Sequence, residues 1–270
     1  LPRLASGEAV AAFCLTEPET GSDAASVRTT FEDAGDEWAI TGRKLWVTFG
    51  QRADVFLVVG RNDAGPVAAL VERDAPGLDL RAVEGQLGLR AAMLAEVVLD
   101  RCRVPKANTI GRPGFGFSHV ASTTLDHGRY SVAWGCVGIA RACLEASVSY
   151  ASSRVQFGVP LRDHQLIRRM IADMQVSTDA ARLLCIEAGR RRAAADPGSI
   201  PATAAAKYFA SSILPRVTND AVQIHGANGV DPAYSVERHF RDAKIMQIIE
   251  GTDQMHQLGI AEAALREASE

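Results

Sequence analysis

The sequence lacks several features that would place it in an easily recognised class of protein. It has no run of about 20 uninterrupted apolar residues, and its N-terminus has no basic segment followed by an apolar one. We therefore expect neither a membrane span nor a secretion signal. The formal net charge is only −3 over 270 residues. Basic and acidic residues are spread along the chain, so we expect no binding to nucleic acid or to an anionic membrane surface.

Cysteine is also scarce, and no cysteine lies in a CxxC motif or in a Cys/His cluster. An odd number of scattered cysteines favours reduced thiols in a cytoplasmic protein and predicts no metal site. The five are Cys14, Cys102, Cys136, Cys143 and Cys185. The sequence also lacks a GxGxxG motif after a predicted strand, which argues against a nicotinamide-dinucleotide fold.

The hydrophobic pattern divides the chain into two halves. Short apolar or alternating runs separated by turn residues fill the first half and are typical of strands. These runs are Val10–Leu15, Trp38–Thr41, Lys44–Thr48, Val55–Val59, Val67–Val71 and Val97–Leu99. The Asp-Ala-Gly-Asp-Glu segment at 33–37 has the composition of a hairpin turn. We expect an antiparallel β-sheet domain over residues 1–112.

After residue 114 the apolar residues recur at steps of three and four, which is the period of a helix. The breaks around Gly158, Pro197 and Gly226–Pro232 separate the predicted helices. We expect helices at about 117–152, 163–194, 200–228, 234–247 and 252–268. Short connections between long helices favour antiparallel packing, so residues 113–270 are expected to form an up-down helical bundle.

Two segments of the first half have residues suited to binding a polar, planar ligand. Residues 16–23 (TEPETGSD) combine hydroxyl groups with Gly21, which permits close approach of a ligand. A polar turn is the simpler interpretation of this segment alone. In residues 44–50 (KLWVTFG), strand alternation places Trp46 and Thr48 on one face, where they would offer an aromatic wall and a hydrogen bond. A tryptophan in a sheet is nevertheless more often a core residue.

Two segments of the second half have residues suited to binding phosphate. Arg154 in RVQFG (154–158) offers charge-assisted hydrogen bonds to a pyrophosphate, and Gln165 begins the next predicted helix. A cation that stabilises the helix C-terminus is the alternative for Arg154. In QIHGANG (223–229), two glycines allow backbone groups to meet a ligand, although Gly229 is equally consistent with a simple helix C-cap.

Glu250 is the strongest candidate for a catalytic base. It follows the apolar pair Ile248 and Ile249 and precedes Gly-Thr, where the last predicted helix begins. Desolvation at such a position would raise the pKa of the carboxyl group toward that of a useful general base. A glutamate near a helix N-terminus is more often a favourable charge or a cap, and this alternative stays open for the residue taken alone.

Taken in order, these segments resemble the flavin and active-site motifs of the acyl-CoA dehydrogenase family. The resembling segments are TEPETGSD (16–23), KLWVTFG (44–50), RVQFG with DHQ (154–158 and 163–165), QIHGANG (223–229) and IIEGT (248–252). The resemblance implies an α+β fold in which an antiparallel β-barrel domain precedes a four-helix bundle. Members of the family also have an N-terminal helical domain of about 110 residues, on the usual scale of domains, which is not represented in this sequence.

The resemblance also implies which residues contact ligands. The residues expected to bind FAD are Phe13, Leu15, Thr16, Gly21, Ser22, Trp46, Thr48, Arg154, Phe157, Gln165, Gln223, Gly226, Thr252 and Gln254. The residues expected on the substrate side are Ser22, Asp126, Arg129, Ile249 and Gly251. Ala227 replaces a glycine that is common in the family motif. The family has two places for its base, and in this chain the second is Gly128, which cannot accept a proton. The resemblance therefore assigns the role of base to Glu250.

The reaction implied by the resemblance is α,β-desaturation of an acyl thioester, with an electron-transfer flavoprotein as electron acceptor and a homotetramer as the assembly. The thioester is either an acyl-CoA or an acyl group on a carrier protein, as in polyketide-type metabolism. An oxidase that passes electrons to oxygen is an alternative. A non-catalytic flavin-binding scaffold is a further alternative from a different class. Acyl chain length and branching are not predicted.

Overall fold

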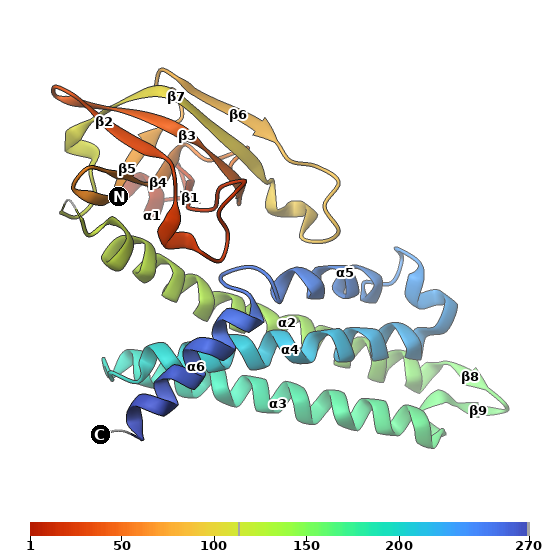
Figure 1. The fold of residues 1–270 in the computed structure, drawn as a ribbon. Helices are drawn as coiled ribbons and strands as arrows, with labels where there is room; N and C mark the ends of the chain where they lie inside the picture. The colour runs from red at the N-terminus through yellow and green to blue at the C-terminus, as the bar shows by residue number, and fades with distance from the viewer. Residues whose placement is uncertain (113, 269–270) are drawn as a thin grey trace. The chain divides into compact units, whose positions relative to one another are not determined.

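The structure is a computed structural model that describes residues 1–112 and 114–268, and the chain forms two compact units (Figure 1). The first unit, called the sheet unit below, comprises Leu1–Gln86 and Arg90–Leu125. The second, called the helical unit, comprises Leu87–Leu89 and the chain from Asp126 onward. The domain boundary expected after residue 112 adjoins Pro113, which lies outside the described residues, as do residues 269–270. This boundary stays a prediction.

Seven strands form the sheet of the sheet unit: β1 (Ala11–Cys14), β2 (Thr30–Ala34), β3 (Glu37–Val47), β4 (Val55–Asn62), β5 (Gly65–Glu72), β6 (Leu78–Ala82) and β7 (Ala95–Pro105). Short helical elements accompany them: α1 (Pro2–Ala5), η1 (Ala24–Ser26), η2 (Arg90–Ala92), η3 (Lys106–Asn108) and the π-helix η4 (Gly116–Ala121). The strand order is β1-β4-β2-β3-β7-β6, with β5 paired to β4. The sheet curls into a half-barrel (Figure 1).

The predicted strands are present, with three corrections. The pairing of β1 with β4 is parallel, so the sheet is not antiparallel throughout. The runs Trp38–Thr41 and Lys44–Thr48 belong to one strand, β3, whose pairing with β7 is shifted between Lys44 and Val47. Strand β6 was not predicted; it is short, with five residues that are at most half-buried. The hairpin at 33–37 is confirmed, with Gly35 at φ 80° between β2 and β3.

The helical unit contains the long helices α2 (Ser122–Ser153), α3 (Gln165–Ala193) and α4 (Ser199–His225) and the shorter α5 (Val236–Met246) and α6 (Asp253–Glu267). The predicted positions of these helices are confirmed to within a few residues. A small hairpin of β8 (Val155–Gln156) and β9 (Val159–Pro160) joins α2 to the 3-10 turn η5 (Leu161–Asp163), and η6 (Gly226–Val230) follows α4. Helix α4 packs against α3, α5 and α6. Its C-cap is Gly226 at φ 59°, and not Gly229.

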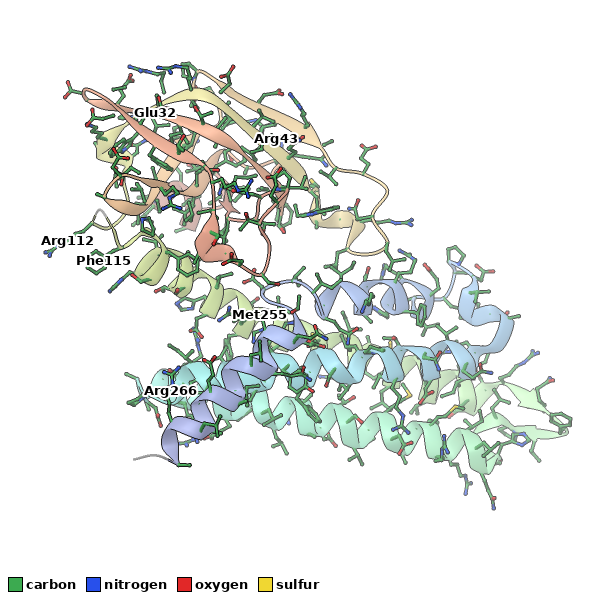
Figure 2. All side chains as sticks on the ribbon, viewed as in Figure 1. Glu32, Arg43, Arg112, Phe115, Met255 and Arg266 are labelled. Carbon is green, nitrogen blue, oxygen red and sulfur yellow. The ribbon has the colours of Figure 1, made fainter. Side chains whose placement is uncertain are left out.

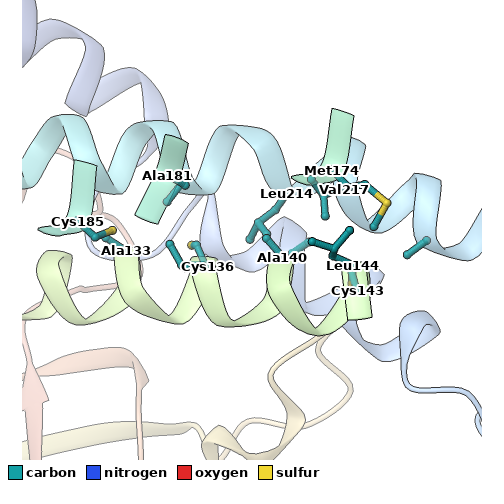
Figure 3. Close-up of a cluster of buried hydrophobic side chains, with 14 of the residues drawn as sticks. Ala133, Cys136, Ala140, Cys143, Leu144, Met174, Ala181, Cys185, Leu214 and Val217 are labelled. Carbon is teal, nitrogen blue, oxygen red and sulfur yellow. The ribbon is translucent and has the colours of Figure 1, made fainter. Parts of the chain in front are cut away.

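Small side chains fill the core of the helical unit. Ala133, Cys136 and Ala140 on α2 and Leu214 and Val217 on α4 are buried in one cluster (Figure 3). Alanine and cysteine at the contact allow the helix backbones to approach closely, and partly buried aromatic residues such as Trp134 and Phe209 pack around this cluster.

All five cysteines are buried free thiols, as predicted. Burial raises the pKa of the thiols of Cys14, Cys136 and Cys143 to about 12. Thiols with such high pKa values carry almost no reactive thiolate at neutral pH, so these cysteines are packing residues.

Residues 116–153 form a helix that is long and apolar enough to cross a membrane by length and mean hydropathy, which reaches 1.2 in one window. Its buried face, which includes Ala133, Cys136 and Ala140, is part of the cluster of Figure 3. We interpret it as a core helix of the bundle.

Candidate functional site

Glu250 lies in the loop between α5 and α6, and this loop has an unusual backbone. Glu250 and Gly251 have φ values of 56° and 92°, in the left-handed region that a non-glycine residue rarely adopts. Two cationic side chains hold the loop from neighbouring helices. Arg129 Nε on α2 donates to the carbonyl oxygen of Glu250 at 3.1 Å, and Lys207 Nζ on α4 donates to the carbonyl oxygen of Gly251 at 2.9 Å. Two consecutive carbonyl groups are thereby fixed.

The Glu250 carboxylate lies directly against Gly128 on α2. A Cβ atom at Gly128 would be 2.5 Å from Glu250 Oε2, so only glycine leaves room for the carboxylate. Oε2 is buried and has no hydrogen-bond partner among the described residues. Burial raises the pKa of Glu250, and the charges of Arg129 and Lys207 oppose this rise only in part. The group has the properties of a base that is not occupied by structural bonds.

A buried network anchors the loop to α4 and α6. Lys207 Nζ lies 3.4 Å from Asp253 Oδ1, and both residues are buried. Ser211 Oγ donates to the same Asp253 oxygen at 2.6 Å, and Gln247 Nε2 donates to Asp253 Oδ2 at 3.1 Å. Thr252 begins α6, as predicted, and its hydroxyl accepts from the backbone N–H of Met255 at 3.3 Å. Every contact in this network restrains the segment that contains Glu250.

His256 is a further buried group beside the loop. Its Nε2 has no partner among the described residues and lies 3.3 Å from where a Cβ at Gly251 would be. Burial, together with the charges of Lys207 and Arg129, lowers the pKa of His256 to about 4. The imidazole is therefore neutral at neutral pH and adds no positive charge next to Glu250.

Helix α6 borders a hollow of about 310 Å³ on the helical unit. Met255 near the start of the helix and Arg266 near its end are both labelled in Figure 2. The residues that line the hollow are Arg129, Ile200, Pro201, Ala204, Met255, His256, Gly259, Ala263 and Arg266. Arg129 and His256 thus face both this hollow and the Glu250 loop.

Of the other predicted substrate-side residues, Ser22 belongs to the sheet unit, and the rest belong to this loop or to α2. Ile249 directly precedes Glu250 and is half-buried. Asp126 forms an ion pair with Arg192 of α3 through Oδ2, while its Oδ1 is buried and has no partner among the described residues. Asp126 and Arg129 are three residues apart on α2, so both lie on the same face of the helix.

In the sheet unit, a buried ion pair holds the predicted flavin-ring segments together. Lys44 Nζ donates to Glu17 Oε1 at 2.8 Å and to the carbonyl oxygen of Leu15 at 3.0 Å. Glu17 also accepts from the hydroxyl of Thr29 at 2.6 Å. Burial alone would raise the pKa of Glu17, but hydrogen bonds from Lys44, Thr29 and two backbone amides outweigh it and hold the pKa below its usual value. The backbone N–H of Leu45 donates to Thr16, which joins residues 16–23 to β3.

Trp46 is presented at the surface of the sheet unit and is not a core residue. Its side chain is 53% exposed, and its φ of 61° coincides with the irregular pairing at the end of β3. Thr48 is also exposed, as are Gly21 and Ser22, whereas Phe13 and Thr16 are half-buried. The Leu15 side chain is buried in a core cluster, so only its backbone can contact a ligand.

The predicted pyrophosphate and adenosine residues fall into two groups within the helical unit. Arg154, Phe157 and Gln165 surround the β8–β9 hairpin, and all are exposed; Phe157 is 94% exposed. Gln223 and Gly226 end α4, whose His225 stacks on Tyr150 of α2 at 4.3 Å between ring centroids. Thr252 and Gln254 belong instead to the start of α6, at the other end of the helical unit from the hairpin (Figure 1).

Lys207, Asp253 and His256 were not predicted from the sequence as residues of this site. A signal for Lys207 was present, because it is the only charged residue in an otherwise uncharged, alanine-rich helical stretch from Ala202 to Ala210. A lysine in such a stretch must either be exposed or find a buried partner. The sequence does not show which partner it finds, since Asp253 is 46 residues away.

Comparisons with known proteins cover almost the whole chain. Residues 12–102 match the family model for the acyl-CoA dehydrogenase middle domain, and residues 114–265 match the model for the C-terminal domain. A probable acyl-CoA dehydrogenase of Mycobacterium leprae is 40% identical over 98% of this chain and 69% of the relative.

Solved structures show the same fold. Butyryl-CoA dehydrogenase from Megasphaera elsdenii matches with a TM-score of 0.94 and 37% identity over 97% of this chain and 70% of that one. The prolyl acyl carrier protein oxidase AnaB matches with a TM-score of 0.93 and 28% identity over the same shares. The α+β fold class, with its sheet and helical parts, is thereby confirmed.

The buried pair of the sheet unit predicts a clear difference between two lysine substitutions. Lys44→Met leaves the Glu17 carboxylate buried without its cation, and we expect a loss of about 3–5 kcal/mol in the free energy of unfolding at neutral pH. Lys106→Met removes a more exposed ion pair with Asp33 and should cost much less stability. Urea unfolding followed by circular dichroism measures both.

A second variant separates charge from packing. Adding Glu17→Gln to Lys44→Met removes the unpaired charge, so the double variant should recover part of the lost stability. Equal stability of the two single lysine variants would contradict a structural role for the Lys44–Glu17 pair.

Proposed function

Because this chain belongs to the acyl-CoA dehydrogenase family, we propose that it catalyses α,β-desaturation of an acyl thioester, with Glu250 as the base that removes the α-proton. The observation that carries this proposal is the Glu250 carboxylate itself. It is desolvated, it has an unpaired Oε2, and it lies against the one residue type that leaves room for it. A structural carboxylate would have its hydrogen bonds satisfied, as the carboxylate of Glu17 does.

The residues present fit a flavin, and we propose FAD as the cofactor. Exposed Trp46 and Thr48 offer a flat apolar surface and a hydroxyl, and Arg154 is exposed and has no partner for its side chain among the described residues. A planar ring and a pyrophosphate are the groups that such side chains bind. The proposed FAD contacts are Phe13, Leu15, Thr16, Gly21, Ser22, Trp46, Thr48, Arg154, Phe157, Gln165, Gln223, Gly226, Thr252 and Gln254. FAD, when bound, supplies the acceptor for the β-hydrogen and its electron pair.

Glu250 removes a proton that is only weakly acidic, so its environment must favour the transfer. Burial raises the pKa of the carboxyl group and thereby makes the ionised form a stronger base. The backbone N–H of Glu250 donates to no acceptor among the described residues, and Arg129 and Lys207 hold the carbonyl groups of Glu250 and Gly251 in place. We propose that this N–H donates to the thioester oxygen as negative charge develops there.

Ser22, Asp126, Arg129, Ile249 and Gly251 are proposed to lie on the substrate side. We propose an acyl-CoA as substrate, an electron-transfer flavoprotein as acceptor and a homotetramer as the assembly, as the family resemblance implies. The scattered cysteines support a cytoplasmic location. The similarity to a prolyl acyl carrier protein oxidase supports a second candidate, in which the thioester is on a carrier protein and oxygen is the acceptor. Hydrogen peroxide formation distinguishes the oxidase from the dehydrogenase.

Replacement of the base tests the proposal directly. Glu250→Gln keeps the shape of the side chain but cannot accept the proton, so the rate of flavin reduction by substrate should fall about 10²- to 10⁴-fold. The measurement is the loss of flavin absorbance after anaerobic mixing with acyl-CoA and acyl-carrier thioesters, with FAD content as the control. Reduction of the variant at the wild-type rate would refute the assignment of Glu250.

Gly128→Ala tests the space that the carboxylate occupies. Its Cβ would clash with the flexible end of Glu250, so the fold should survive while the carboxylate moves, and we expect a fall of about 10- to 100-fold in the rate of flavin reduction. Gly138→Ala on the same helix is the matched control, because no heavy atom lies within 4 Å of its Cβ position. It should retain the wild-type rate and gain up to about 1 kcal/mol of stability. Equal rates in the two variants would contradict the proposed position of the base.

A further inference from the structure

Lys207 is the least expected residue of the helical core. It lies in the middle of α4 and is 0% exposed. Burial of an ammonium group is costly, and an apolar side chain of similar size at such a position is often as stabilising as a buried ion pair. Packing alone therefore does not explain why a lysine occupies this position.

The bonds of Lys207 all lead to the Glu250 loop. Its ammonium donates to the carbonyl oxygen of Gly251 at 2.9 Å and lies 3.4 Å from Asp253 Oδ1. Ser211, one turn further along α4, donates to the same carboxylate oxygen at 2.6 Å. Helix α4 thus fixes the two ends of the tripeptide Gly251-Thr252-Asp253.

This contact complements the one from α2. Arg129 holds the carbonyl group of Glu250, and Lys207 holds the next carbonyl group along the chain. With both oxygens fixed, the peptide unit between Glu250 and Gly251 is restrained, although the positive φ of Glu250 is costly for a non-glycine residue to maintain. Loss of either bond would free the loop to relax toward an ordinary conformation.

We propose that Lys207 is a positioning residue for the reaction: with Arg129 it locks the Glu250–Gly251 peptide and so sets the direction of the Glu250 carboxylate. This inference rests on the proposed role of Glu250 as base. Lys207 itself touches neither the thioester nor the reacting atoms in this account. It acts through the loop.

The charge of Lys207 adds a second effect that a structural role would not produce. Glu250 is surrounded by Arg129 from α2, Lys207 from α4, and Asp253 and neutral His256 from α6. The positive charges of Arg129 and Lys207 lower the pKa of Glu250 against the larger effect of burial. Removal of the Lys207 charge should therefore raise this pKa. The rate of a reaction that needs ionised Glu250 would then rise only at higher pH.

The test compares three variants of the purified flavin-loaded protein in anaerobic flavin reduction across a range of pH. In Lys207→Met, the rate at saturating acyl-CoA should fall about 10- to 100-fold, and the acid limb of the pH profile should move to higher pH, with little change in the half-saturating concentration. Lys207→Arg keeps the charge, so its acid limb should stay near that of the wild type. Leu214→Ala, a fully buried substitution on the same helix, should lower the unfolding midpoint without moving the limb.

A wild-type rate and acid limb in folded Lys207→Met would overturn the inference, as would an equal shift of the limb in Leu214→Ala. If Lys207→Met does not fold, the rate of flavin reduction in Ser211→Ala tests the inference instead. That variant removes the hydroxyl group that donates to Asp253, together with its bonds to the carbonyl oxygens of Lys207 and Tyr208 in the same helix, and a fall of about 3- to 10-fold supports the inference. An unchanged rate refutes it.

Two further measurements separate this inference from the proposed function. Glu250→Gln in the same assay tests the base alone: if it reduces flavin at the wild-type rate, the proposed function fails regardless of Lys207. Hydrogen exchange of the peptide that covers residues 248–256, measured without cofactor, tests separately whether Lys207 restrains the Glu250 loop. Faster exchange in Lys207→Met than in Leu214→Ala supports a restraint of the loop by Lys207, and equal exchange in the two variants refutes it.

Discussion

The proposed position of the Glu250 base depends on two cationic side chains that hold two consecutive carbonyl groups in place. Arg129 and Lys207, from different helices, hold the carbonyl oxygens of Glu250 and Gly251. This arrangement keeps a non-glycine residue at a positive φ, with its carboxylate against Gly128 and with a backbone N–H that finds no acceptor in residues 1–112 and 114–268. The backbone strain is offset by charge-assisted hydrogen bonds in a region of low dielectric, where such bonds are strong.

The sheet unit uses the same physical device. Lys44 and Lys207 are both completely buried, and each donates to one backbone carbonyl oxygen and pairs with one carboxylate. In each unit the lysine connects a regular element to an irregular segment that contains predicted ligand contacts. The irregular segments are residues 16–23 in one unit and residues 247–252 in the other. A buried ion pair is not an efficient source of stability, so its use here is better explained by the need to define one loop conformation.

Periodicity and turn residues predicted the helices and most strands, because amphipathic patterns are local properties of the sequence. They did not predict the parallel pairing of β1 with β4, which depends on contacts between distant segments. The motifs located the Glu250 loop and the surface position of Trp46, although the composition of a strand favoured a core role for this tryptophan. Lys207 and Asp253 were not predicted, since their pairing exists only after α4 and α6 have packed together.

The central claim is that the Glu250 carboxyl group is desolvated and kept free of structural hydrogen bonds. Carbon-13 NMR of protein labelled at the glutamate carboxyl carbons measures this directly, with the resonance that is absent from Glu250→Gln identifying Glu250. We expect a titration midpoint clearly above the ordinary glutamate value of about 4.3, because the carboxyl group is buried. A midpoint at or below that value would show that the carboxylate is solvated or ion-paired, and would contradict the account.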